Sequence, residues 1–467
     1  MRINGLMIDC SRLLERPEYY DRLLDFMADW GMNTLLLHFS DDYGCAVRLP
    51  GFGHLAMRRA FTPAALTRWL VRAKRRGIDV IPELEAFGHT RYITDHPRHR
   101  HLYAGRRQRR LTFNAIDPLH PETYRLMRGL VRAVAAAFPS RYLHLGCDEV
   151  NLADYCRGRD LDPDAVWADY VNAVIGYAHD AGKVPMIWGD HPAKSPAIAR
   201  RLRKDVVLVE WRYEPDVKDT VLPALKRAGF RDFFVAPALG CYRHRFLPVA
   251  PALENTRRMT RFGASHRVRG VLNTIWCPWR YLQNAMYYGI AYSADTVRAN
   301  GRADSAAVDA RFARRVFGTP LTPALADFLR AYPRVEVPFT VAQQLAAKEL
   351  DLNPEQLRQM RRTNAAGRRA LAAATAYRPR RNRDIWRGMV LAARCAWLCS
   401  ESVMLRLGQG TAARRAAYNR LLVDARRALD EEWDRTRFAD DPQKRRPRFP
   451  NDDDQYALLL MRKLPRL

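Results

Sequence analysis

The chain has 467 residues, 48% of them hydrophobic, and its 78 Lys and Arg against 50 Asp and Glu give a formal net charge of +28. This length exceeds a single core, and the ordinary apolar content argues against long disordered regions. So large a positive charge would attract nucleic acid, but it is spread along the chain without the signature of a nucleic-acid module, so we expect no nucleic-acid partner.

The start of the chain and its apolar runs indicate where in the cell the protein is expected. Met1 to Gly5 leads directly into a strand-like stretch, without the charged leader, apolar core and cleavage site of a secretory signal. No apolar run reaches the length of a membrane span. The eight cysteines are scattered without CxxC spacing, as expected of reduced thiols in a large intracellular chain. We therefore expect a cytoplasmic protein with no membrane partner.

Apolar stretches of strand length alternate with stretches of helical periodicity from residue 5 to residue 294. The expected strands are residues 5–9, 34–38, 79–83, 142–145, 184–188, 206–210, 233–236 and 270–274. The expected helices are residues 19–30, 63–76, 121–138, 166–181, 195–203, 216–228, 253–261 and 281–294. Because each strand is apolar throughout, as in a parallel sheet covered on both faces, we predict an α/β fold with a (β/α)8 TIM barrel over residues 1–319.

Beyond Pro320 the alternation of strands and helices stops. Alanine- and arginine-rich stretches of helical periodicity follow at residues 354–376 and 384–407. We predict a C-terminal α-helical region over residues 320–467, and its last part, from Arg435, contains Pro442, Pro447 and Pro450 and is expected to be extended. Such a tail could wrap a second subunit, which leaves room for a homo-oligomer.

Polar and aromatic residues gather at the carboxyl ends of the expected strands, where TIM barrels carry their chemistry. The stretch Arg141 to Val150 is the clearest case, because an apolar strand reaches Gly146 and then presents Asp148 and Glu149 side by side. Neighbouring carboxylates raise each other's proton affinity, which acid/base chemistry requires. The alternative is that Asp148 caps a helix and Glu149 forms a salt bridge.

His144-Leu145-Gly146-Cys147-Asp148-Glu149 resembles the His-x-Gly-x-Asp-Glu signature of the β-N-acetylhexosaminidases of glycoside hydrolase family twenty. The resemblance extends, in the right order, over residues 5–295. It is carried by Gly5 to Arg12, Leu37 to Asp42, Pro82 to His89, Pro118 to Tyr124 and Met186 to Asp190. The lack of the family's N-terminal domain, Cys147 and the turn Phe87-Gly88-His89 are most similar to the hexosaminidase D branch, an intracellular group that favours galactosaminides.

The resemblance implies a retaining, exo-acting enzyme in which the substrate's own acetamido group is the nucleophile. Glu149 would be the general acid and base, with a pKa raised by burial and by Asp148, and Asp148 would hold the acetamido N–H. Other residues are expected to bind or position the substrate: Tyr242 at the acetamido oxygen, Trp188, Trp211 and Trp276 as apolar walls, and Asp9, Asp41, His89 and His144 around the acid. Either histidine could instead be structural. No metal constellation appears, and we expect no cofactor.

Three departures from the family pattern concern the groups that hold sugar hydroxyls. The usual arginine before the first strand is Asn4, the Trp-x-Glu of the eighth strand reads Trp276-Cys277-Pro278, and the Tyr-x-Asp after the seventh strand reads Tyr242-Arg243-His244. These departures favour an alternative in which the chain is a sugar-binding or scaffold protein without activity. The leading hypothesis remains a β-N-acetylhexosaminidase acting on a small-molecule or oligosaccharide substrate that ends in N-acetylgalactosamine or N-acetylglucosamine.

Overall fold

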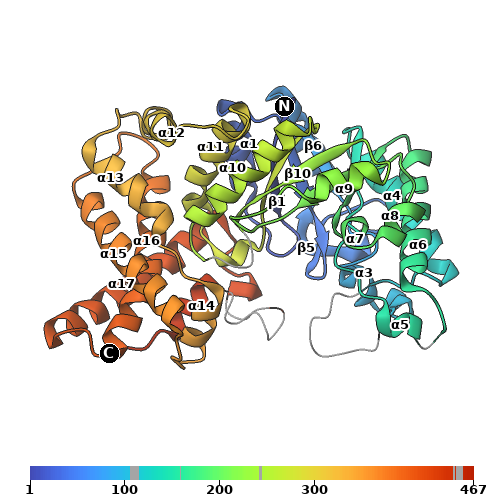
Figure 1. Cartoon of the computed structure of the whole chain (residues 1–467). Coiled ribbons are helices and arrows are strands. Elements are labelled where there is room, and N and C mark those ends of the chain that lie inside the picture. Colours follow the sequence, from blue (N-terminus) through green and yellow to red (C-terminus); the bar gives the residue numbers. More distant parts are fainter. Residues whose placement is uncertain (106–114, 158, 241–244, 445–447, 449–455) are drawn as a thin grey trace. The chain divides into compact units, whose positions relative to one another are not determined.

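The computed structural model describes residues 1–105, 115–157, 159–240, 245–444, 448 and 456–467. Eight parallel strands form a closed barrel within this part of the chain (Figure 1). In barrel order they are β1 (Ile3–Asp9), β2 (Thr34–His38), β6 (Asp79–Glu83), β7 (Tyr142–His144), β8 (Val184–Trp188), β9 (Val207–Trp211), β10 (Phe233–Ala236) and β12 (Gly270–Ile275), and β12 pairs with β1. The predicted TIM barrel is therefore confirmed.

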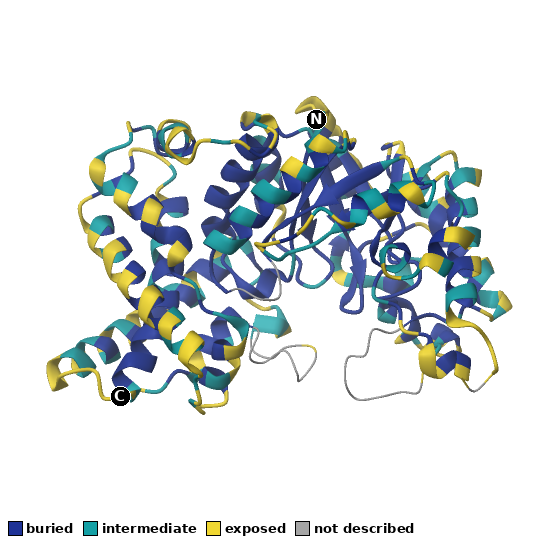
Figure 2. Ribbon diagram, in the orientation of Figure 1, coloured by how far each residue is buried: buried dark blue, intermediate teal, exposed yellow. Residues whose placement is uncertain are grey.

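The barrel strands form because they are continuous apolar runs that are buried on both faces. In β2 all five residues are buried, and Leu35, Leu36 and Leu37 have no exposed surface. Figure 2 shows the same deep burial over most of the barrel strands. A run without a polar face is stable only when it is covered on both sides, and a closed barrel surrounded by helices provides this.

The helices that follow the barrel strands along the chain begin at residues that favour a first helical turn. They are α1 (Pro17–Asp29), α2 (Pro63–Arg75), α4 (Pro121–Ala137), α6 (Pro163–Asp180), α8 (Pro196–Arg201), α9 (Val221–Arg227), α10 (Ala250–Ser265) and α11 (Gln283–Arg298). Five of them start with proline, which suits the first helical turn because the missing N–H would have no partner there. The side chains of Thr62, Asp162 and Ser195 cap α2, α6 and α8.

A small three-stranded sheet between β2 and α2 was not predicted. It consists of β3 (Ser40–Asp41), β4 (Gly44–Val47) and β5 (Ala56–Phe61), and the 3₁₀ helix η1 (Gly53–Leu55) lies between its last two strands. Short helices α3 (Arg91–Thr94), η2 (Pro97–Leu102), α5 (Ala153–Arg157) and α7 (Asp190–Lys194) follow later strands. Such short elements show no usable periodicity in the sequence, yet they shape the carboxyl ends of the strands.

The chain divides into two compact units. The first consists of residues 1–237 and 258–274, and the second of residues 238–257 and 275–467. The second unit includes α11, which packs on α16 (Arg383–Arg406), together with α12 (Ser305–Phe312), α13 (Pro323–Ala331), α14 (Phe339–Ala346), α15 (Pro354–Thr375), α17 (Ala412–Thr436) and α18 (Ala457–Lys463). The predicted C-terminal helical region is confirmed, while the boundary at residue 319 stays a prediction.

The tail from Arg435 is not extended throughout. Residues Ala457, Leu458, Leu460 and Met461 are buried in α18, because this segment has enough apolar side chains to pack as a helix. Arg437 is also buried, and its guanidinium donates to the carbonyl oxygens of Pro278 and Tyr281. These contacts make part of the tail a packed component of the second unit.

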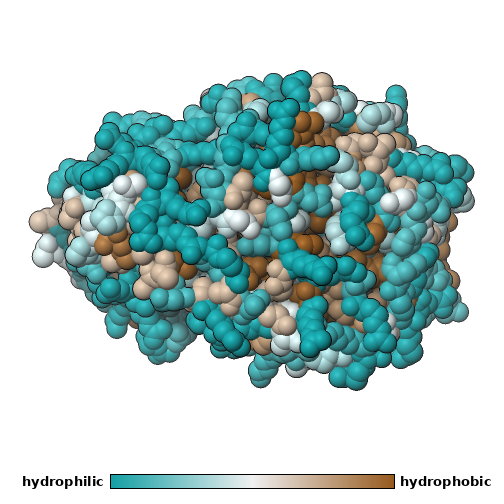
Figure 3. Space-filling view, turned by 90° about the horizontal axis from the view of Figure 1, so that it is seen from above, coloured by the Kyte–Doolittle hydropathy of each residue, from teal (hydrophilic) through white to brown (hydrophobic). Residues whose placement is uncertain are grey.

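Helix α16 is long and apolar enough to cross a membrane, with a mean hydropathy of 1.3 over its best window, so the expectation that no run reaches this length was wrong. However, 89% of that window is buried inside the protein. Burial of this extent is what the core helix of a helical domain shows, and the length alone does not favour a membrane span. The face in Figure 3 is largely hydrophilic, with apolar residues interspersed.

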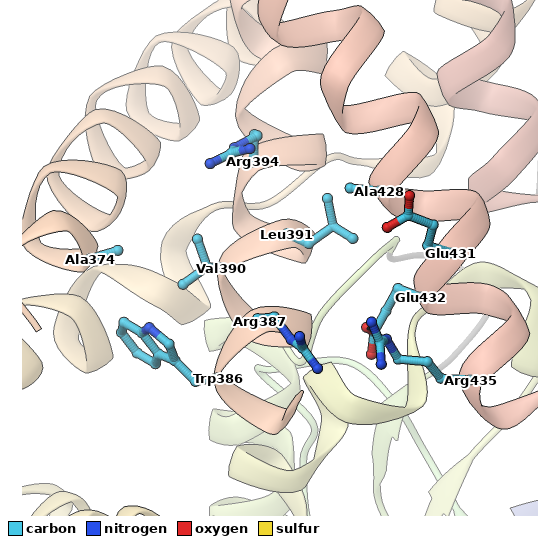
Figure 4. Close-up of a pocket in the computed structure, with 10 residues that line it drawn as sticks. All are labelled: Ala374, Trp386, Arg387, Val390, Leu391, Arg394, Ala428, Glu431, Glu432 and Arg435. Atoms are coloured by element: carbon cyan, nitrogen blue, oxygen red, sulfur yellow. Dashed lines mark ion pairs between the residues drawn. The ribbon is translucent and has the colours of Figure 1, made fainter. Parts of the chain in front are cut away.

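A pocket of about 250 Å³ lies among α15, α16 and α17 in the second unit (Figure 4). Its lining includes Arg387, Glu432 and Arg435, and Arg435 forms an ion pair with Glu432 at 2.9 Å. The side chain of Asn284 donates a hydrogen bond to the same carboxylate at 2.6 Å. None of the predicted site residues lines this pocket.

Candidate active site

The register of the barrel brings four polar residues into one row at the carboxyl ends of the strands. Asp9 of β1 pairs with His38 of β2, His38 with Glu83 of β6, and Glu83 with His144 of β7. All four are buried. Since parallel strands end at the same edge of the barrel, residues up to 61 positions apart in the sequence become direct neighbours there.

The segment after β7 turns sharply to present the two carboxylates. Gly146, Cys147 and Glu149 have φ values of +63°, +70° and +53°. Side chains rarely adopt this left-handed conformation, and strain of this kind in non-glycine residues is common at functional sites. Glycine is required at position 88, because a β-carbon there would collide with the carbonyl oxygen of Asp148. The turn that carries His89 therefore packs directly on the carboxylate segment.

His89 lies between two pairs of carboxylates. Its Nδ1 is 3.3 Å from Asp42 Oδ2 and 3.7 Å from Asp41 Oδ2, while its Nε2 is 3.8 Å from Asp148 Oδ2 and 3.6 Å from Glu149 Oε2. Burial would lower the pKa of His89, but these carboxylates raise it well above its usual value. The imidazole is therefore a cation that connects the β2 end of the barrel with the β7 end.

The predicted raised pKa of Glu149 was wrong. Burial works to raise the pKa of Glu149, but His89, Arg12 and Lys194 together lower it below its usual value. Its side chain is 35% exposed, whereas that of Asp148 is 12% exposed. Burial, together with the charges of Asp190 and Glu149, raises the pKa of Asp148 to about 8. The more enclosed carboxylate therefore holds the proton, and its neighbour is ionised.

Arg12 is a site residue to which the sequence had assigned no role. Its guanidinium nitrogens lie 2.9 Å from Asp9 Oδ2 and 2.7 Å from Asp41 Oδ2, and its side chain is 13% exposed. Burial would raise the pKa of Asp41, but Arg12 and His89 lower it. The sequence signal that could have identified Arg12 was its position three residues after Asp9, the carboxylate at the end of β1. The structure thus brings Asp9, Asp41 and His89 together around an arginine that was not expected.

Trp188 and His144 lie deeper in the barrel than predicted. Trp188 is 1% exposed, and its indole N–H donates a hydrogen bond to Glu83 Oε1 at 2.7 Å. His144 is fully buried, accepts the N–H of Gly146 at Nδ1, and packs on Trp188 with ring centroids 4.5 Å apart. Burial lowers the pKa of His144 to about 4, so its ring is neutral. These placements do not favour Trp188 as an apolar wall or His144 as a partner of Glu149, and they fit the structural alternative for this histidine.

His38, Glu83 and Glu85 form a buried charged layer beside Trp188. His38 Nδ1 lies 3.0 Å from Glu83 Oε2, and its Nε2 lies 3.1 Å from Asp41 Oδ2. Burial raises the pKa of Glu85 well above its usual value. The sequence placed these residues at the strand ends but assigned them no role. They support the groups that are nearer the surface.

The backbone after β7 is held from the β8 side. Glu149 N–H donates to Asp190 Oδ2 at 3.3 Å, and Val150 N–H donates to His191 Nε2 at 3.1 Å. At the end of β9, burial raises the pKa of Glu210 to about 8 although Arg212 donates to its carboxylate. Two acceptors from α7 thus fix the unusual backbone that carries Glu149.

The remaining predicted aromatic residues are less well placed by the structure. Trp211 is half-buried at the end of β9, and its ring centroid lies 5.2 Å from that of Tyr213. Trp276 belongs to the second unit, where its backbone N–H donates to the carbonyl of Gly240 at 2.8 Å. Tyr242 lies outside the described residues. The substrate contacts assigned to these three residues stay predictions.

Several groups of side chains could hold a metal ion, which the sequence did not indicate. Asp41, Asp42 and His89 have ligand atoms within 4.8 Å of one another, and so do His89, Asp148 and Glu149. Both groups share His89, whose nitrogens are already directed at carboxylates. The ion pairs with His89 are sufficient to explain why these side chains lie close together. Chemically, a protonated carboxylic acid, an ionised carboxylate and an imidazolium lie within reach of one another, which is suited to moving a proton.

Comparison with known proteins agrees with this geometry. Residues 3–231, about half of the chain, match the model of the glycosyl hydrolase family 20 catalytic domain. A β-hexosaminidase of Vibrio furnissii is 28% identical over 201 residues, which cover 36% of this chain and 30% of that protein. A β-N-acetylhexosaminidase of Cellulomonas fimi is 28% identical over 202 residues, covering 39% of this chain and 38% of that protein. The chain thus spans about a third of the length of these relatives.

Two solved structures share this fold. A family 20 exo-β-N-acetylglucosaminidase of Vibrio harveyi has a TM-score of 0.51 at 19% identity and covers 66% of this chain and 56% of its own. An N-acetyl-β-hexosaminidase of Streptomyces plicatus has a TM-score of 0.52 at 18% identity and covers 66% of both chains. At such low identity these structures support the barrel fold alone. Together with the family model, which matches residues 3–231, the comparisons show that the chain belongs to glycosyl hydrolase family 20.

Proposed function

We propose that the chain is a retaining, exo-acting β-N-acetylhexosaminidase that releases terminal N-acetylgalactosamine or N-acetylglucosamine by substrate-assisted catalysis. The observation that carries the proposal is the pair Asp148 and Glu149 at the exit of β7, with His89 within 3.8 Å of both carboxylates. The family is a known exception to the scheme with two catalytic carboxylates, because the acetamido oxygen of the substrate attacks the anomeric carbon. One acid and one holder of the amide are then sufficient.

The two carboxylates would have different roles in catalysis. Glu149 protonates the glycosidic oxygen and later takes a proton from the attacking water. Asp148 accepts the acetamido N–H and stabilises the positive charge of the cyclic oxazolinium intermediate. These roles require a proton on Glu149 and a charge on Asp148, which is the reverse of the protonation that the surroundings of the two carboxylates favour.

Substrate binding would reverse the two protonation states. An amide N–H that donates to Asp148 favours its ionised form and so lowers its raised pKa. A sugar that covers Glu149 excludes water from a side chain that is 35% exposed in the free site, and this raises the pKa of Glu149. His89 Nε2 faces both carboxylates and is placed to pass the proton between them. Glu149 would therefore carry its proton only when the substrate is bound.

A binding measurement with a thiazoline mimic of the cyclic intermediate tests this mechanism. The wild-type protein should bind the thiazoline much more tightly than the parent sugar, since the mimic resembles the state that catalysis stabilises. Asp148→Asn should weaken this binding, because a neutral amide cannot balance the positive ring nitrogen. Asp169→Asn, on the exposed face of α6, is the matched control and should bind as the wild type does.

A substrate panel separates the proposal from its alternatives. N-acetylhexosaminides should be hydrolysed, and glucosides and galactosides without the acetamido group should not. A covalent adduct with a fluorosugar, seen by intact mass spectrometry, would overturn the substrate-assisted mechanism. Binding of N-acetyl sugars without any turnover would favour a sugar-binding protein instead. The galactosaminide preference and the cytoplasmic location implied by the resemblance stay predictions.

A further inference from the structure

Three histidines gather in the first unit at a place that the proposed reaction does not use. His54 lies in η1, His96 immediately precedes η2, and His99 lies within η2. One ring nitrogen of each lies within 4.8 Å of the others. The ring of His54 has its centroid 4.8 Å from that of His96 and 5.3 Å from that of His99. Two separate segments of the chain thus direct imidazoles toward one point.

The spacing of the closest pair is close to that of metal ligands. Nε2 of His54 and Nε2 of His99 are 3.0 Å apart. Around a tetrahedral zinc ion with metal–nitrogen bonds of about 2.0–2.1 Å, neighbouring nitrogens lie roughly 3.3 Å apart. A small adjustment would therefore allow a cation to enter between these two rings. It would replace one hydrogen bond between neutral imidazoles with two coordinate bonds.

The environment of His99 also suits a ligand. Its side chain is 11% exposed, and its Nδ1 makes no hydrogen bond with the described residues. Glu122 Oε1 lies 4.0 Å from this nitrogen, on the side away from His54. A carboxylate behind a ligating imidazole orients the ring and increases its basicity. Glu122 and His99 therefore resemble the carboxylate–histidine pairs that are common where a histidine binds a metal.

The hydrogen bonding of His96 is compatible with coordination. Nδ1 of His96 accepts the N–H of Arg98 at 3.3 Å, which is a long hydrogen bond. Coordination through either nitrogen of His96 would give up that bond in exchange for a bond to the metal.

We propose that His54, His96 and His99 bind one borderline divalent cation of the zinc type. Imidazole ligands suit zinc, copper or nickel and are poor ligands for magnesium and calcium, which prefer carboxylate and carbonyl oxygens. A fourth position is left for water. The cation would tie the insertion that carries Asp41 and Asp42 to the segment that follows His89 and α3. It would thus brace two of the segments that build the candidate active site.

A second group beside it is the competing location. His101, His120 and Glu122 also have ligand atoms within 4.8 Å of one another. Here, however, His101 Nε2 is already paired with Glu122 Oε2 at 2.9 Å, and His120 Nδ1 accepts the N–H of Glu122. This group is therefore satisfied without a cation, and a substitution at His120 distinguishes it from the proposed site.

Isothermal titration of zinc into the untagged, full-length protein, first stripped of metal by a chelator, tests the proposal. We expect one equivalent to bind. Loss of the carboxylate behind a ligating histidine typically costs about 10- to 100-fold in affinity, so loss of a direct ligand in His54→Gln or His99→Gln should cost at least as much. His96→Gln is a further variant in case one of these does not fold. Circular dichroism checks the fold of each variant.

Two controls should keep the wild-type affinity. His179→Gln removes a histidine of α6 that pairs with Asp205, and His120→Gln removes a member of the competing group. Zinc should raise the melting temperature of the wild type and of both controls, but not that of the ligand variants. The proposal is overturned if the wild type binds no zinc, if folded His54→Gln and His99→Gln bind it unchanged, or if His120→Gln alone abolishes binding.

Discussion

The substitution Asp148→Asn should stabilise the protein relative to the wild type, and the difference should grow as the pH rises. The folded protein raises the pKa of Asp148 from 3.8 to about 8. Between these values the folded site holds a proton that the unfolded chain has released. The stability that depends on this proton is complete below about pH 4 and is lost as the pH rises toward 8. Asparagine does not titrate, so the stability of the variant does not fall in this way as the pH rises.

The size of the effect follows from the number of protons involved. One proton of difference changes the free energy of unfolding by about 1.4 kcal/mol per pH unit, so the ceiling between pH 5 and pH 7 is roughly 2.7 kcal/mol. The titration of Asp148 is coupled to the charges of His89 and Glu149 beside it. The folded and unfolded states therefore differ by less than one bound proton. We therefore expect a gain of about 1–2 kcal/mol for the variant over this range.

Urea denaturation at pH 5, 6 and 7, followed by circular dichroism, measures this gain. The wild type, Asp148→Asn and the surface control Asp169→Asn are compared at each pH, so that titrations elsewhere in the chain cancel. The control should follow the wild type. A difference between Asp148→Asn and the wild type that is constant with pH, or that shrinks as the pH rises, would show that Asp148 is ionised in the folded protein and would refute the reasoning.

Three further predictions concern neighbouring residues. Glu149→Gln should lower kcat by about 10²–10⁴-fold on substrates with poor leaving groups and less on activated ones; equal losses would argue against its role as the acid. His89→Gln removes a cation that lowers the pKa of both Asp148 and Glu149, so both limbs of the kcat/KM profile should move to higher pH, and unmoved limbs would contradict this. Arg12→Ala removes the cation that forms ion pairs with the buried Asp9 and Asp41 and should cost about 3–5 kcal/mol in urea unfolding, with partial recovery in Arg12→Lys; a loss below 1 kcal/mol would show that the ion pairs are unimportant.

Local pattern was sufficient for the barrel and for the pair of carboxylates. Each barrel strand is a continuous apolar run, and such a run allows few structures other than a strand covered on both faces. Asp148 and Glu149 are adjacent in the chain, so their proximity needed no tertiary information. The short strands β3 and β4 were missed because two to four residues carry no periodicity.

The distribution of charge among the site residues could not be derived from the sequence. It depends on His89 and Arg12, which reach the carboxylates only after the turn at Gly88 and the barrel register have placed them. The histidines of the proposed metal site present the same contrast. His96 and His99 are close in the sequence, but His54 joins them only through the fold.

The sequence by itself determined the barrel, the helical region after it and the identity of the two central carboxylates, because these follow from hydrophobic periodicity and from neighbours along the chain. Only the tertiary structure decided that Asp148 rather than Glu149 carries the raised pKa, that Trp188 is buried against Glu83, and that Arg12 anchors the site. The physical reason is that pKa values and contacts depend on burial and on charges a few ångströms away, and residues far apart in the sequence supply both.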